Sequence, residues 1–128
     1  MEKNFVLNGN KLIAEFMGWT TKSRYHHIKQ RKVLEWIVPE NSNNIYYEFN
    51  DGYLECFEER FHESWDWLIP VVEKIEKEYE VSIIDNECEI CTTGYKIKVL
   101  VSVVSNSKIE AVYKAVIKFI EWYNENKE

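Results

Sequence analysis

The sequence contains few of the residues that interrupt regular secondary structure or cross-link a chain. Its 128 residues include four glycines, two prolines and three cysteines. Few glycines and prolines leave little room for long flexible linkers, and the composition is not that of a disordered chain. An odd number of cysteines excludes a complete disulfide framework and favours a reducing compartment. No apolar run approaches the ~20 residues of a membrane span. We therefore expect one domain over residues 1–128, cytoplasmic and without membrane contact.

Catalytic motifs are lacking as well. The chain has no GxSxG, HExxH, Walker or GxGxxG pattern. Its three histidines are His26, His27 and His62. Adjacent histidines in a basic segment are usually solvated, and a histidine just before a helix start is usually a hydrogen-bonding loop residue. We therefore expect a protein that is not an enzyme and that holds no cofactor.

Cys88 and Cys91 form a CxxC pattern, which raises the question of a metal site. A zinc site needs a second pair of ligands and a turn that brings both thiolates to one ion. Here the pattern lies at the end of a predicted strand, where residues three apart point to opposite faces. Cys56 and His62 do not complete a zinc spacing. The sequence therefore predicts Cys88 inside the core beside Ile90, and no metal.

The segment 61–80, FHESWDWLIPVVEKIEKEYE, organises the predicted core. At 100° per residue it places Leu68, Val72 and Ile75 on one helical face, with Trp65 and Tyr79 at either end. Ser64 is a suitable N-cap. The pattern predicts a helix that begins near Ser64 and buries this face.

The remaining elements follow from periodicity and turn residues. Asn8 or Asn10 can cap a short helix that ends before Gly18, and Asn106 or Ser107 can cap a last helix with an apolar face from Ile109 to Tyr123. Segment 20–30 has no clear period and is interpreted as a basic loop. Strands are predicted at 32–38, 45–49, 53–57, 81–91 and 95–104, with hairpins at Asp51-Gly52 and at 92–94 and with Ile97, Val99, Val101 and Val103 on a buried face.

The predicted fold class is therefore α+β. One antiparallel sheet of about four or five strands packs with three helices as a sandwich, in the order α-β-β-β-α-β-β-α.

Three segments carry a resemblance to a known family: KLIAEFMGW (11–19), FHESWDWLIPVVEKIE (61–76) and SKIEAVYKAVIKFIEWYN (107–124). Together they cover about a third of the chain. They resemble a group of small uncharacterised phage and prophage proteins, and they are also similar to the phage ABA-sandwich domain. In that family an AEKVMGW-like helix precedes an aromatic-led helix ending VVEKL, a strand pair and a final helix. The resemblance implies a phage-type protein but no activity.

The charged residues are unevenly distributed along a chain of net charge −6. The charged residues of segment 51–66 are acidic except for Arg60, whereas segment 22–32 carries no acid. Cations interleaved with an aromatic residue can hold phosphates and stack a base. The candidate partner- or phosphate-binding residues are Lys22, Arg24, Tyr25, His26, His27, Lys29, Arg31 and Lys32. The alternative is an ordinary solvated loop.

Trp67 and Trp122 are candidates for a protein interface. Trp67 projects about 200° around its helix from Trp65, away from the predicted core face, and Trp122 lies at the edge of the last helix's apolar stripe. Exposed tryptophan is enriched at interfaces. The alternative is that other elements cover both rings.

Two functions remain open. The first is a phage-type accessory protein that binds a host protein or nucleoprotein in the host cytoplasm, with anti-defence (anti-CRISPR-like) inhibition as a subclass implied by the resemblance alone. The second is a small-ligand or nucleotide-binding module, a sponge or weak enzyme, that uses segment 22–32. Contact with RNA or phosphate through that segment is compatible with both. The sequence leaves the oligomeric state open.

Overall fold

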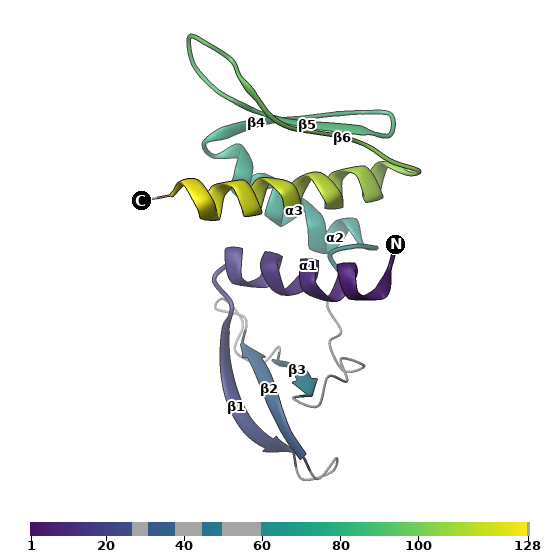
Figure 1. Cartoon of the computed structure of the whole chain (residues 1–128), viewed down its shortest axis with the longest axis vertical. Helices are drawn as coiled ribbons and strands as arrows, with labels where there is room; N and C mark the ends of the chain where they lie inside the picture. Colours follow the sequence, from purple (N-terminus) through teal and green to yellow (C-terminus); the bar gives the residue numbers. More distant parts are fainter. Residues whose placement is uncertain (27–30, 38–44, 50–59, 128) are drawn as a thin grey trace. The chain divides into compact units, whose positions relative to one another are not determined.

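The computed structural model of the protein describes residues 1–26, 31–37, 45–49 and 60–127. The chain divides into two compact units, Met1–Glu59 and Arg60–Glu128. Along the chain, one helix and three strands are followed by a second helix, three further strands and a last helix (Figure 1). The protein therefore belongs to the α+β class, as predicted.

The first unit begins with helix α1 (Lys3–Phe16). It starts earlier than predicted, so both proposed caps, Asn8 and Asn10, are wrong: they lie inside the helix, and Asn10 is buried. Gly18 does follow the helix in the left-handed region, at φ 85°. The backbone N–H of Gly18 donates to the carbonyl of Glu15 at 3.0 Å, so the expected helix end is confirmed.

Strands β1 (Thr20–His26), β2 (Arg31–Ile37) and β3 (Ile45–Phe49) form an antiparallel sheet in that order. The strands predicted at 32–38 and 45–49 are confirmed. The basic loop predicted at 20–30 is wrong over its first part, which is β1. Pairing with the next strand, β2, stabilises its extended conformation, although the segment itself shows no alternation of apolar and polar residues. The predicted strand 53–57 and its Asp51-Gly52 hairpin lie outside the described residues.

The second unit begins with helix α2 (Trp65–Glu76), whose N-cap position is Ser64, as predicted. Leu68, Val72 and Ile75 are buried, which confirms the predicted core face. The expected end residues differ. Trp65 is exposed on the first turn, and Tyr79 is in a strand rather than in the helix.

The second sheet contains β4 (Tyr79–Ile84), β5 (Glu87–Thr92) and β6 (Val99–Val104), each antiparallel to the next. The single strand predicted at 81–91 is therefore wrong, because it is two strands joined by a two-residue turn. Asp85 takes the left-handed conformation there, at φ 51°. Aspartate and asparagine tolerate this conformation better than other non-glycine residues. Asp85-Asn86 is therefore a turn sequence, which the prediction of one strand over 81–91 overlooked.

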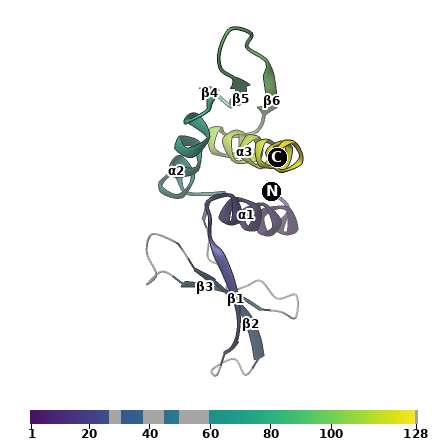
Figure 2. The same cartoon turned by 90° about the vertical axis from the view of Figure 1, so that its left-hand side faces the viewer.

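Helix α3 (Lys108–Asn126) packs against this second sheet (Figures 1 and 2). Ser107 caps it as predicted, because its Oγ accepts a hydrogen bond from the backbone N–H of Glu110 at 3.3 Å. The predicted stripe is largely buried, including Val112, Val116 and Ile120. The described strands make two three-stranded sheets, so the prediction of one sheet with four or five strands is wrong within the described residues.

Candidate functional site

The basic segment is a strand pair rather than a loop over its described residues. Lys22, Arg24, Tyr25 and His26 lie in β1, and Arg31 and Lys32 lie in β2. His27 and Lys29 are outside the described residues.

The register of this pair brings several candidates together at one end. Tyr25 is the Cα partner of Lys32, and His26 is the Cα partner of Arg31. Lys22, at the other end, is the partner of the acidic Glu35. The two ends of the strand pair therefore differ in the charge of the residues that the register sets opposite each other. The end near His26 has two cations, a tyrosine and a histidine.

Trp67 makes a specific aromatic contact in the second unit. Its ring meets that of Phe61 edge-on, with centroids 5.3 Å apart, and Trp67 is half-buried. The interface prediction for Trp67 stays a prediction, and the ring is partly occupied by this contact.

Trp122 belongs to an aromatic cluster where α3 meets β4. Its centroid lies 6.0 Å from that of Tyr79 and 5.8 Å from that of Phe119. Tyr79 and Phe119 also meet edge-on at 4.8 Å. Such aromatic pairs stabilise a fold beyond the area that they bury. Trp122 therefore has a packing role, and its half-buried ring leaves only part of its surface for a partner.

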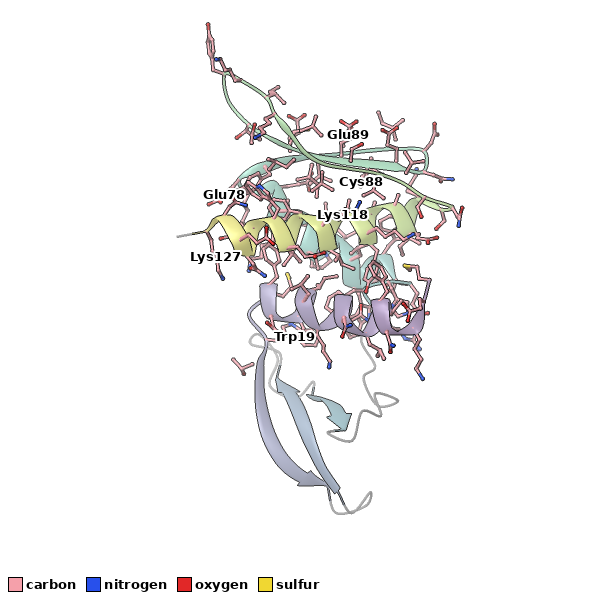
Figure 3. The ribbon with its side chains drawn as sticks, in the orientation of Figure 1. Trp19, Glu78, Cys88, Glu89, Lys118 and Lys127 are labelled. Atoms are coloured by element: carbon pink, nitrogen blue, oxygen red, sulfur yellow. The ribbon has the colours of Figure 1, made fainter. Side chains whose placement is uncertain are left out.

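Cys88 and Cys91 point to opposite faces of the second sheet, as predicted. Cys88 is fully buried on the α3 side, and Figure 3 shows it across the sheet from Glu89. Burial raises the pKa of the Cys88 thiol to about 11. Burial, Glu89 and Glu80 raise the pKa of Cys91. Both thiols are free, neither is activated, and they do not converge on one point.

His62 lies against the ring of Tyr113, with centroids 6.0 Å apart. Burial lowers the pKa of His62, although Glu63, whose carboxylate is 3.7 Å away, opposes the shift. Burial raises the pKa of Tyr113. The contact with Tyr113 packs part of the His62 ring against the core of the second unit.

The loop between β5 and β6, which we call the arm (residues 93–98), was not recognised as a site from the sequence. Hydrogen bonds close its base: the backbone N–H of Thr92 donates to the carbonyl of Lys98 at 2.9 Å, and the N–H of Lys98 donates to Thr92 Oγ1 at 2.9 Å. Gly94 turns the chain at φ 105°. Tyr95 is fully exposed, and Ile97 is 65% exposed between Lys96 and Lys98.

The alternation of apolar and polar residues in segment 95–104 gave a wrong prediction for the arm. It predicted Ile97 and Val99 on the buried face with Val101 and Val103. Only Val101 and Val103 are buried, whereas Val99 is 51% exposed. A register shift in the pairing of Ile90 and Cys91 with β6 breaks the alternation. Ile97 and Val99, which precede the shift, therefore do not continue the buried row of Val101 and Val103 that packs against α3.

Comparison of the chain with protein-family models, curated proteins and solved structures gives no match. Among the described residues, no three or more His, Cys, Asp or Glu side chains gather as a metal ion would require. In the same part of the chain, no helix has both the length and the apolar character of a membrane span.

Proposed function

We propose that this protein is a non-enzymatic binding protein that acts by occupying another macromolecule, and that the arm belongs to its contact surface. The observation that carries the proposal is the exposure of Tyr95 and Ile97 beside Lys96 and Lys98. Water contact with neighbouring large apolar side chains is unfavourable, and such groups commonly mark interaction sites.

The chemistry of the arm favours a protein partner with an apolar pocket and acidic surroundings. Tyrosine supplies a large rigid contact and is enriched among the residues that dominate binding. The two hydrogen bonds between Thr92 and Lys98 at the base pre-organise the loop, which lowers the entropy lost on binding. The two lysines favour a partner of opposite charge and speed encounter with it.

The biological setting of the proposal comes from the segments that resemble phage and prophage proteins. A phage-type accessory protein would meet its partner in the host cytoplasm. Anti-defence inhibition, including anti-CRISPR-like activity, is the subclass that we place within this proposal.

The test is affinity capture from a host lysate, with and without nuclease, by the parent and by a Tyr95→Ser/Ile97→Ser variant. We expect the parent to retain a defined partner and the variant to bind it at least tenfold more weakly. Ile69→Ser is the matched control, because Ile69 is a 39% exposed apolar residue on α2, away from the arm. Equal capture by the arm variant at an unchanged melting temperature would refute the role of the arm.

A second candidate function is contact with RNA or with the phosphates of a nucleotide through the β1–β2 strand pair. The register that sets Tyr25 opposite Lys32 and His26 opposite Arg31 favours it. Nuclease treatment separates the two candidates. Capture that nuclease abolishes supports the strand pair, and capture that survives nuclease supports the arm.

A further inference from the structure

Strand β6 lies at an edge of the second sheet. The sheet order is β4-β5-β6, so β6 meets β5 on one side and, within the described residues of Arg60–Glu128, no strand on the other. Helix α3 lies against one face of the sheet and leaves the edge itself open (Figures 1 and 2). An open edge offers a row of backbone N–H and C=O groups to another strand.

The usual protection of an edge is missing from β6. Val99–Val104, with the sequence VLVSVV, contains no charge and no proline. Its side chains Val99 and Val104 are 51% and 72% exposed. The opposite edge strand, β4, does carry a charge, at Glu80. Charge therefore protects only one of the two edges of the sheet.

We propose that β6 pairs antiparallel with β6 of a second copy of this chain. The β4-β5-β6 sheets of the two copies would then form one six-stranded sheet. The sequence favours this partner because Leu100–Val104 is nearly palindromic about Ser102. A twofold axis at Ser102 sets Val101 opposite Val103 of the other copy, and Leu100 opposite its Val104.

That register also matches the two faces of the sheet. Val101 and Val103 are buried on the α3 side, whereas Ser102 and Val104 are exposed on the other side. Partners across an antiparallel pair must lie on the same face, and a shift by one residue would set buried valines opposite outward residues. The axis at Ser102 satisfies this rule for both rows.

Charge does not oppose strand pairing locally at this edge. The chain has a net charge of −6, so two copies repel at a distance. The strand β6 is uncharged, so no like charges meet within the new strand pair. A twofold contact of this kind closes on itself and stops at a dimer, because each copy has a single β6 edge and both are used in the contact.

The experiment measures the mass of the parent by sedimentation equilibrium across a concentration series, beside two variants. Val104→Lys introduces a charge at an exposed position of β6. Ile84→Lys is the control: Ile84 is 66% exposed and lies in the same cross-strand row, Ile84–Glu87–Val104, but on the opposite edge. We expect a dimer for the parent and for Ile84→Lys, and at least a tenfold weaker dimer for Val104→Lys. Circular dichroism and melting temperature establish that all three fold alike.

A second measurement tests the register. Ser102→Cys places two thiols beside the proposed axis, so a short bismaleimide should link two chains. Ser82→Cys, in the same row on β4, should give no more cross-linking than the parent with its own cysteines. A monomeric parent throughout the concentration series, equal weakening by Val104→Lys and Ile84→Lys, or equal cross-linking by both cysteine variants would overturn the proposal.

Discussion

Val72 shows what a single buried position contributes. It is 4% exposed on α2, beside the fully buried Leu68 and Val71. We expect Val72→Asp to destabilise the protein by about 3 kcal/mol or more, because a carboxylate without a partner would enter the apolar core. A small domain has only about 5–15 kcal/mol in total, so thermal unfolding should show a large drop.

Glu73→Asp is the control for this change, since it places the same side chain at the exposed neighbouring position. It should melt close to the parent. A Val72→Asp protein that also melts within a degree or two of the parent would contradict the core position of α2.

The two cysteines of the second sheet should differ in reactivity. Cys88 is fully buried with a pKa near 11, so it should resist a soluble alkylating reagent until the protein unfolds. Cys91 lies on the opposite face and should react in the native state. Because burial, Glu89 and Glu80 raise its pKa, the rate should keep increasing with pH through the alkaline range. Peptide mass spectrometry after timed labelling measures both.

The same pair leads us to expect no tightly bound zinc, since the two thiols diverge across the sheet. Elemental analysis of protein purified without chelator tests this. One equivalent of zinc that disappears in Cys88→Ser would show that the expectation is wrong.

At the scale of the element, the turn between β4 and β5 depends on Asp85. A β-branched residue at φ 51° clashes with its own backbone, so Asp85→Val should cost about 1–2 kcal/mol of folding free energy. Asp85→Gly should stay within about 0.5 kcal/mol of the parent, because glycine adopts this conformation freely. Denaturant titration measures both, with Glu87→Val, in the adjacent strand, as the control. Equal stability of the two valine variants would argue against a strained turn.

The helices and strands also show which parts of the fold can be predicted from local sequence patterns. The core face of α2, the cap at Ser107 and the helix end at Gly18 depend on local chemistry, so local patterns predicted them. The split between β4 and β5 was missed because Val81–Cys91 contains no glycine or proline. The exposed arm was missed because a register shift at Ile90 and Cys91 is a property of strand pairing. The strand character of 20–26 likewise depends on pairing with another strand, β2, and not on a pattern within the segment itself.

For the candidate site, the sequence identified the basic residues but not their conformation. It did not identify Tyr95, because an alternating pattern does not reveal where a covering helix ends. Trp67 and Trp122 were selected by their helical angle, and that angle carries no information on Phe61 and Tyr79, the rings that contact them.

At the scale of the whole molecule, the basic segment stands against an overall charge of −6. If it contacts nucleic acid, replacing Arg24, Lys29 and Arg31 by Gln should weaken RNA binding. It should also flatten the salt dependence, because each lost phosphate contact lowers the slope by about one unit. The melting temperature should change little, since exposed ion pairs contribute only about 0–1 kcal/mol.

The matched control removes the same charge elsewhere, by Lys108→Gln, Lys118→Gln and Lys127→Gln, all exposed in or next to α3. Binding is measured by fluorescence anisotropy over a range of salt concentrations. If both triple variants lose affinity equally, the effect is one of net charge and the segment is not a site.

The second sheet has one further consequence, which concerns how the chain folds. Its strands pair in the order in which they occur, β4 with β5 and β5 with β6, and α3 then folds back onto β5 and β6. The loops that must close are therefore short, and the entropy lost before each new contact forms is small. Chains dominated by such local contacts fold quickly. Each strand and helix of residues 79–126 can therefore pair with a neighbour in the chain without closing a long loop.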